Sequence, residues 1–224
     1  MSLRPLHLSA LLGSLALAAC GVGNRILGTV ATPDQATARF VNATVTSLDL
    51  AKSGVVNTGN GNIVPGGAVS CFPVPDLVNP GITIRQAGTT TDLAGFAPRF
   101  SAGGRYTLVG FPNATGGIQF ATVPTATVPN VGRSALRVFN ASPTITSADL
   151  YFTVPGTAFG AARETGVVFG ASSGSFDVPA GTVQVRLVSA GPVVTDLGSF
   201  VLAPDRSYTI IATSATAPVL VPDC

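Results

Sequence analysis

The cysteines are the residues whose type and position specify chemistry most clearly in this sequence. Cys20 closes the string Leu17-Ala18-Ala19-Cys20, behind an apolar stretch that starts at Leu8 and follows a positive charge at Arg4. The stretch is too short to span a bilayer as a helix, and it has the length of the apolar region of a secretory signal. We therefore expect a signal peptide over residues 1–19, cleavage before Cys20 and acylation of its sulfur.

Acylation of Cys20 would anchor the mature chain to a membrane. Each buried acyl methylene contributes about 0.8 kcal/mol, so two or three chains hold a protein on a bilayer almost permanently. By resemblance to Gram-negative lipoproteins, Gly21 in place of an aspartate implies sorting to the outer membrane. Residues 20–34 would then form a lipidated tether. The alternative is an ordinary signal peptide in which the cysteine occurs by chance.

Two further cysteines, Cys71 and Cys224, remain after lipidation. An even pair in an oxidising compartment predicts a disulfide. That bond would link the second half of the sequence to the first, and the chain-entropy model gives so long a loop about 4–5 kcal/mol. The alternative is two separate thiols, one of them buried.

Histidine chemistry is absent from the expected mature chain, because the one histidine, His7, lies in the signal peptide. This removes Ser-His-Asp triads, histidine acid–base catalysis and histidine-ligated metals. Gly170-Ala171-Ser172-Ser173-Gly174 matches the nucleophile-elbow string. Without a histidine, we expect it to form a turn or bulge before a strand at Phe176. We predict no catalytic residue and no enzyme activity.

The ten carboxylates are scattered along the chain. Glycoside hydrolysis by paired carboxylates needs two acids about 5–10 Å apart, and nothing in the sequence favours such a pair. We expect Asp49 and Asp149 to accept backbone N–H bonds at turns or strand ends. The alternative is a calcium-ligand role, which no D-x-D-x-D-G loop supports. With no glycine-rich phosphate loop either, we predict no metal and no cofactor.

The composition predicts the elements that position these residues. Helix formers are scarce, while short runs of Val, Thr, Ile and Phe alternate with the 26 glycines and 17 prolines, which indicates an all-β fold. An apolar content of 46% argues against disorder. The net charge of +2, without a basic cluster, excludes a nucleic-acid partner. The absence of tryptophan weakens a lectin interpretation.

The sequence repeats itself at an offset of about one hundred residues. Blocks recur in a constant order, which makes chance improbable. They are Arg39–Ala43 with Arg137–Ala141, Ser47–Leu50 with Ser147–Leu150, Phe72–Pro75 with Phe176–Pro179, Ile82–Arg85 with Val183–Arg186, Thr91–Leu93 with Thr195–Leu197, and Arg105–Leu108 with Ser207–Ile210. We expect two tandem β-domains over residues 35–124 and 134–224, with residues 125–133 as a linker or edge strand.

Three asparagines, Asn42, Asn113 and Asn140, lie in N-x-[ST] strings. In a bacterial lipoprotein we expect these strings to occur by chance. Asn42 and Asn140 occupy matching positions of the repeat, which favours a shared structural role such as capping a strand end.

Each repeat shows the two-residue period of β-strands. Turn signals at Pro179-Ala180-Gly181 and at Ala203-Pro204-Asp205-Arg206 predict antiparallel hairpins. The segment Ser207–Thr213 is apolar on both faces, so we expect it to be buried on both. Strands are expected in the second repeat at Ala135–Asn140, Asp149–Val154, Gly174–Val178, Thr182–Ser189, Gly198–Leu202, Ser207–Thr213 and Pro218–Val221. This spacing fits a sandwich or a small barrel, and of the two we expect immunoglobulin-like antiparallel β-sandwiches.

Several of these blocks together resemble a known bacterial family. The motifs are Asn140-Ala141-Ser142-Pro143, Asp149-Leu150-Tyr151, Val178–Thr182 and Arg206–Thr209. They are similar to domain of unknown function 4397, a family of secreted or lipid-anchored β-sandwich domains that often occur in tandem. The first repeat departs from the pattern, since Asn42-Ala43-Thr44 lacks the proline. The resemblance implies a fold and a location, and no enzymatic activity.

These observations predict a non-catalytic, lipid-anchored envelope protein with a structural or macromolecular interaction role. Edge strands and loops would provide the contact surfaces. Its partners would be the membrane, through the lipid on Cys20, and an envelope protein or glycan. The first alternative is a small-ligand or glycan-binding module that uses the sandwich loops. A hydrolase with carboxylate-only chemistry is a third hypothesis, which no motif supports.

Overall fold

The computed structural model describes residues 35–93, 97–190 and 193–224, and within these ranges the protein is all-β, without a helix. The strands of the first half are β1 (Ala36–Asn42), β2 (Leu48–Lys52), β3 (Val55–Val56), β4 (Phe72–Val74), β5 (Ile82–Gln86), β6 (Arg105–Pro112) and β7 (Ile118–Pro124). Those of the second half are β8 (Arg133–Asn140), β9 (Ser147–Thr153), β10 (Glu164–Val168), β11 (Phe176–Pro179), β12 (Gly181–Ser189), β13 (Val193–Leu202), β14 (Arg206–Ala212) and β15 (Val219–Pro222).

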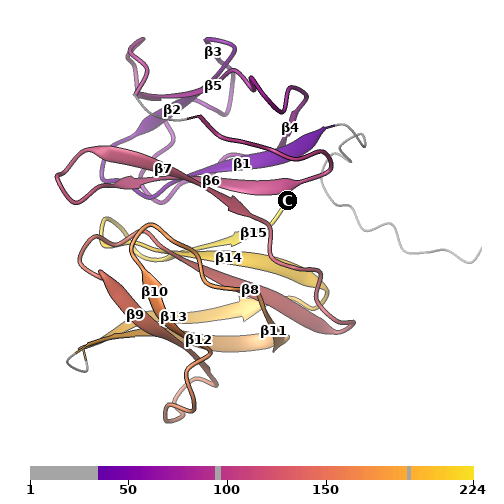
Figure 1. Cartoon of the computed structure of the whole chain (residues 1–224), viewed down its shortest axis with the longest axis vertical. Helices are drawn as coiled ribbons and strands as arrows, with labels where there is room; N and C mark the ends of the chain where they lie inside the picture. The colour runs from indigo at the N-terminus through magenta and orange to yellow at the C-terminus, as the bar shows by residue number, and fades with distance from the viewer. Residues whose placement is uncertain (1–34, 94–96, 191–192) are drawn as a thin grey trace, which may run out of the picture.

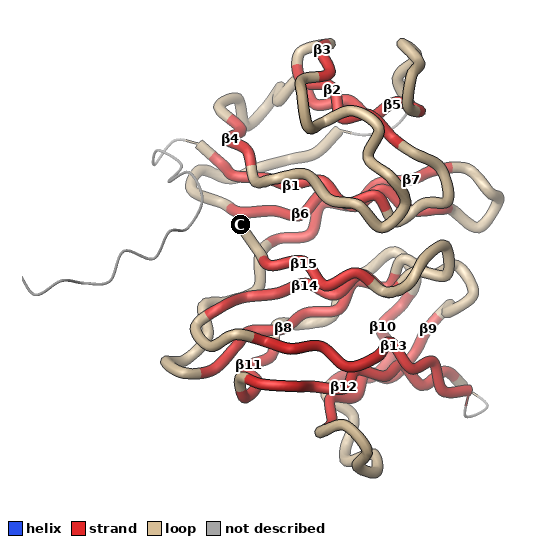
Figure 2. Tube along the Cα trace, turned by 180° about the vertical axis from the view of Figure 1, so that it is seen from behind, coloured by secondary structure: helices blue, strands red, loops and turns tan. Residues whose placement is uncertain are grey.

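The strands form four sheets that stack as layers (Figure 1). The first unit, made of the strands up to β7, has an outer sheet of order β3-β2-β5 and an inner sheet of order β4-β1-β6-β7. The second unit has an inner sheet of order β11-β8-β14-β15 and an outer sheet of order β10-β9-β12-β13. The two inner sheets have the same strand order, so the sequence repeat is also a repeat of topology. The view from behind shows the same four layers (Figure 2).

Each inner sheet contains a parallel pair, which corrects the expectation of purely antiparallel sheets. β1 runs parallel to β6, and β8 runs parallel to β14. Parallel neighbours need a crossover connection, and the strands of the outer sheet provide it, because the chain visits that sheet before it returns. The connection from β1 to β6, for example, passes through β2, β3 and β5 of the outer sheet and includes the edge strand β4 of the inner sheet.

The expectation of hairpins at the two turn signals was also wrong. The turn at Pro179-Ala180-Gly181 leads from β11 in the inner sheet to β12 in the outer sheet, and residues 203–205 lead from β13 back to β14. Gly, Pro and Asp report a local reversal of the chain. They do not indicate which sheet the next strand joins, because that depends on how the apolar faces of the strands pack.

Every strand expected in the second unit is present, with shifted bounds. β13 begins at Val193 and not at Gly198, and β10 (Glu164–Val168) was not expected at all. β10 has a register shift between Glu164 and Val167 that interrupts the two-residue period. The segment between Pro124 and Arg133 is a linker and not a strand.

Three apolar clusters hold the layers together. One fills each unit between its inner and outer sheets, and a third joins the two inner sheets. Neighbouring residues of β14 illustrate the arrangement: Ile210 packs in the core of the second unit, while Ile211 packs in the third cluster. This confirms the burial of that segment on both faces. The two units therefore share a core, and their division into separate domains stays a prediction.

A tyrosine closes the same corner in both units. The hydroxyl of Tyr106 on β6 accepts a hydrogen bond from the amide of Ser101 at 3.0 Å, and that of Tyr208 on β14 accepts one from Ala203 at 3.1 Å. Each tyrosine thus fixes the loop five residues upstream of it. A tyrosine hydroxyl bonded to the backbone shortly before its own strand is also a feature of immunoglobulin-like sandwiches.

One end of the stack gathers the starts of the central inner strands β1, β6, β8 and β14, and we name it the Gln35 end. The carbonyl of Gln35, just before β1, accepts a hydrogen bond from the amide of Gly103. Arg105 at the start of β6 and Arg206 at the start of β14 line one small cavity together. This end lies on the right-hand side of Figure 1.

Candidate functional site

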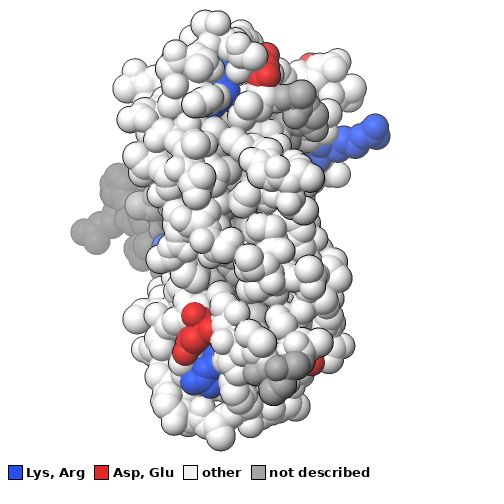
Figure 3. All heavy atoms as spheres, turned by 90° about the vertical axis from the view of Figure 1, so that its left-hand side faces the viewer, with Lys and Arg blue, Asp and Glu red and all other residues white. Residues whose placement is uncertain are grey.

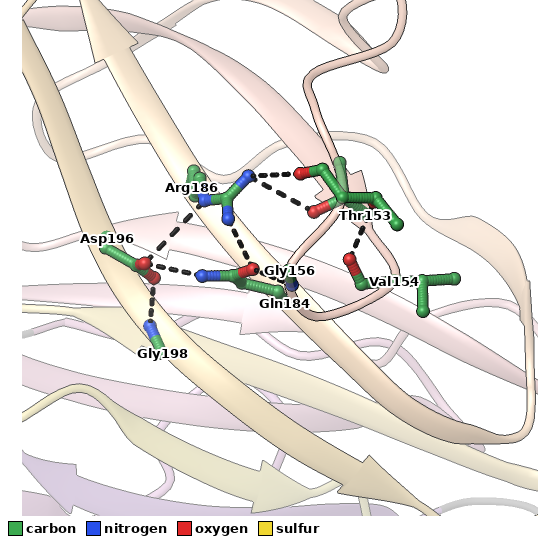
Figure 4. A network of polar contacts seen from close by, with 8 residues as sticks. Thr153, Val154, Gly156, Gln184, Arg186, Asp196 and Gly198 are labelled. Atoms are coloured by element: carbon green, nitrogen blue, oxygen red, sulfur yellow. Dashed lines mark hydrogen bonds and ion pairs between the residues drawn. The ribbon is translucent and has the colours of Figure 1, made fainter.

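A polar network covers the outer face of the second unit's outer sheet (Figure 4). Arg186 on β12 lies at its centre, with a side chain that is only 13% exposed. Its guanidinium donates to the side chains of Thr153 and Gln184 and lies 3.6 Å from Asp196. The Asp196 carboxylate accepts further hydrogen bonds from the Gln184 amide at 2.6 Å and from the backbone of Gly198 at 2.8 Å. All the polar groups of this network are thus engaged with one another.

The loop that follows β9 is fastened onto this network. Arg186 donates to the carbonyl of Thr157, and the amide of Gly156 donates to Gln184, both at 3.4 Å. The loop carries Phe159, whose ring meets Tyr151 edge-on at 5.1 Å and lies 4.8 Å from the Arg186 guanidinium. Phe159 remains 45% exposed. The arginine therefore presents an aromatic side chain on the outermost layer.

Comparison of the two units shows which contacts of Arg186 recur in the repeat and which do not. The arginine–aspartate pair recurs in the first unit, where the Nε of Arg85 lies 2.5 Å from Asp92. The residue opposite that arginine differs, because Asp49 pairs with Arg85 whereas Tyr151 pairs with Arg186. The ion pair thus belongs to the repeated fold, whereas an aromatic pair beside this arginine occurs, among the described residues, in the second unit alone.

Cys71 and Cys224 form a disulfide, as expected from the sequence. Their sulfur atoms lie 2.17 Å apart and the residues are 153 positions apart in sequence. Cys71 lies just before β4 of the first unit, and Cys224 follows β15 of the second. The bond therefore crosses between the two inner sheets at the Gln35 end.

A carboxylate beside the disulfide lies among polar groups of both units. Asp223 accepts hydrogen bonds from the amide of Ala126 in the linker and from the hydroxyl of Thr209 on β14, both at 2.8 Å. Burial raises the pKa of Asp223, while those hydrogen bonds and the positive charges of Arg137 and Arg39 oppose the rise. Burial likewise lowers the pKa of Arg39 and of Arg137. Asp223 thus holds the linker against the second unit.

The G-x-S-x-G string has a backbone role. Ser172 forms a β-bridge with Phe139. The Ser173 hydroxyl accepts a hydrogen bond from the amide of Val138 at 3.0 Å and donates to the carbonyl of Gly174 at 2.8 Å. The string precedes β11, as expected, and it fixes the chain against β8.

Asp49 and Asp149 both accept hydrogen bonds from backbone amides, as the sequence predicted. Asp49 binds the amides of Asn62 at 2.6 Å and Gly88 at 3.0 Å. Asp149 binds the amide of Gly166 at 3.0 Å. No cluster of three or more metal-ligating side chains occurs in residues 35–93, 97–190 or 193–224.

Asn42 and Asn140 share the structural role that their positions predicted. Both are completely buried at the ends of β1 and β8. The amide nitrogen of Asn42 donates to the carbonyls of Thr46 and Ile63, and that of Asn140 donates to Ile145 at 2.7 Å. Each side chain thereby pins the loop that leaves its strand.

Asn113 forms a local turn. Its side-chain oxygen accepts hydrogen bonds from the amides of Thr115 at 2.9 Å and Gly117 at 2.8 Å. This contact closes the hairpin between β6 and β7, so the third N-x-[ST] string also serves the backbone.

A cleft of about 640 Å³ opens at the Gln35 end of the first unit. It lies between residues 77–82 and 97–100, and its walls include the apolar Leu77, Ile82 and Phe100 with the polar Asn79 and Arg99. Sequence reasoning missed this cleft, because neither loop has a motif and only folding brings them together.

The predicted lipidation site and signal peptide lie outside the described residues. Cys20, the segment 1–19 and the tether 20–34 therefore stay predictions. None of the described residues belongs to a helix that is long and apolar enough to cross a membrane.

The sequence matches no protein-family model, and no curated protein matches it. The resemblance to domain of unknown function 4397 therefore stays a prediction that rests on its motifs.

Proposed function

We propose that this chain is a non-catalytic protein of the bacterial cell envelope, anchored by a lipid on Cys20. In this proposal its body consists of two tandem immunoglobulin-like sandwich domains of the 4397 type. Its role is structural, or it provides a surface for contact with another macromolecule.

The observation that carries this proposal is the disulfide between Cys71 and Cys224. Structural disulfides persist in oxidising compartments and are rare in the cytosol. A bond between distant parts of the chain therefore supports export, which the signal sequence and the cysteine at its end predict independently. The bond and the shared third cluster join the units into a stiff body, which suits a scaffold.

The aromatic pair on the outer sheet is the best candidate for the contact surface. Aromatic residues and arginine are enriched where proteins bind partners. Phe159 is 45% exposed, and Tyr151 and Arg186 hold it in place. The same exposed ring favours a second candidate function, glycan binding, because sugar rings stack on aromatic faces.

Lipidation is tested by metabolic labelling with an alkyne analogue of palmitate in a Gram-negative host. We expect the wild-type chain to carry the label and to sediment with outer membranes. Cys20→Ser should lose both properties, whereas Cys71→Ser, the matched control, should keep the label. An unlabelled wild-type chain in the soluble periplasmic fraction would overturn the proposed anchor.

The contact surface is tested by affinity capture from envelope extracts with an unlipidated chain that begins at Gly21. We expect Phe159→Ala to lose the captured partner. Val45→Ala, which alters a 72% exposed residue of the first unit, should retain it. Capture of a glycan would favour the second candidate function. Equal capture by both variants would rule out the aromatic pair as the contact.

A further inference from the structure

The Gln35 end carries the three most exposed large apolar side chains of the described residues. Val131 is 92% exposed, and Val78 and Val128 are each 82% exposed. Val78 follows β4 on the loop at the cleft, while the other two lie on the linker between the units. All three therefore belong to loops that continue beyond the ends of the inner strands.

Three exposed arginines share this end with the valines. Arg105 and Arg206 line the small cavity that Val128 also lines, and Arg99 lines the cleft together with Val78. None of these three arginines belongs to an ion pair among the residues that the structure describes. Their guanidinium groups are thus available to an external anion.

The same end also carries acids that are held by internal contacts, and two of them, Asp205 and Asp223, line the small cavity together with Arg105 and Arg206. Asp177 accepts a hydrogen bond from Arg133 at 2.5 Å, and Asp76 accepts two from the backbone of its own loop. Asp205 binds the amide of Gly132 at 3.0 Å, and Asp223 binds Ala126 and Thr209. The opposite end, which faces the viewer in Figure 3, shows a few charged side chains of both signs on a mostly uncharged surface.

The position of Gln35 ties this end to the membrane if Cys20 is acylated. Only residues 21–34 lie between the two, and a fully extended chain of that length spans at most about 50 Å. The body would therefore stay within about 50 Å of the bilayer, and the Gln35 end is the part of it that the tether joins. This step rests on the proposed function.

We propose that the Gln35 end docks directly on anionic lipid headgroups. Arginines near a negatively charged bilayer are attracted to its surface potential over about one Debye length. Exposed apolar side chains add to this attraction when they enter the interface between headgroups and acyl chains. Arg99, Arg105 and Arg206 supply the first contribution, and Val78, Val128 and Val131 supply the second. The opposite end and the outer sheets would remain free for other partners.

The test uses the unlipidated chain from Gly21, which retains every residue of the described fold. Its co-sedimentation is measured with vesicles of phosphatidylethanolamine and phosphatidylglycerol, and with vesicles of phosphatidylcholine alone. We expect binding to the anionic vesicles only, and weaker binding at higher salt. Each arginine near the surface contributes about fivefold to partitioning, so the triple variant R99E/R105E/R206E should bind at least about 100-fold more weakly.

Two comparisons keep the result specific. Arg163→Glu reverses an exposed arginine outside this end and should lower binding far less than the triple variant does. V128S/V131S should weaken binding at constant charge, and circular dichroism establishes that each variant is folded. The proposal fails if the chain from Gly21 does not sediment with anionic vesicles, or if Arg163→Glu has as large an effect as the triple variant. Because no acyl chain is present, this outcome is independent of the labelling of Cys20.

Discussion

Removal of the disulfide should cost the protein a large part of its stability. The double variant C71S/C224S removes both sulfur atoms and leaves no single thiol to react. In the chain-entropy model, a closed loop of 153 residues lowers the entropy of the unfolded chain by about 17 cal/mol/K. This corresponds to about 5 kcal/mol at 25 °C, which is comparable with the total stability of many domains.

The structure gives reasons why the loss should approach this value. The bond ties the segment before β4 to the segment after β15, so it restrains parts of both units. Cys71 also accepts a hydrogen bond from Arg39 at 2.9 Å. The double variant would lose the restraint of the disulfide next to Asp223, the residue that holds the linker through Ala126.

The assay is equilibrium unfolding in urea, followed by circular dichroism because the sequence contains no tryptophan. We expect the free energy of unfolding of the chain from Gly21 to fall by about 3–5 kcal/mol in the double variant. Reduction of the wild-type chain should produce the same fall and should leave the double variant unchanged. A loss below about 1 kcal/mol, or two reactive thiols per denatured, unreduced chain, would refute the reasoning.

Two further predictions test the interface between the units. Phe111→Ala should lower the free energy of unfolding by about 3–5 kcal/mol, because Phe111 is 2% exposed and packs edge-on against Phe139 and Phe169 in the third cluster. Urea unfolding measures this loss. A change below about 1 kcal/mol would contradict the packing of the two inner sheets against each other. Asp223→Asn tests the raised pKa of Asp223. Since the folded state holds this proton more tightly than the unfolded state does, the contribution of Asp223 is most favourable below its unfolded pKa, near 3.9, and declines as the pH rises through the folded pKa. Unfolding measured from pH 3.5 to 7 should therefore show the wild type losing stability relative to Asp223→Asn as the pH rises, and a constant difference would show that the pKa of Asp223 is the same in both states.

The strands of the second unit could be predicted from the sequence, because alternation of apolar and polar residues is a local signal. Ser207–Thr213 was even expected to be buried on both faces, and Ile210 and Ile211 do pack in different cores. The buried Asn42 and Asn140 were placed correctly too, since the repeat put them at matching positions. β10 was missed because its register shift interrupts the period.

The candidate site could be predicted only in part. The bond between Cys71 and Cys224 follows from the parity of the cysteines and the expected compartment. The contact of Phe159 with Tyr151 and Arg186 could not be predicted from the spacing of these residues, because the loop that carries Phe159 folds back over the sheet to make it. The cleft between residues 77–82 and 97–100 could not be predicted either, because only the folded chain brings these two loops together.

The sequence by itself determined the all-β class, the repeat and the backbone roles of the short polar residues, and it favoured a bond between Cys71 and Cys224. These properties depend on composition, on short-range periodicity and on what each side chain can bond. The tertiary structure alone decided that the turn at 179–181 crosses between sheets, that β1 and β6 run parallel, and that two inner sheets bury a common core. Such choices depend on which apolar faces meet across the stack, and a face that is apolar in sequence does not specify its partner.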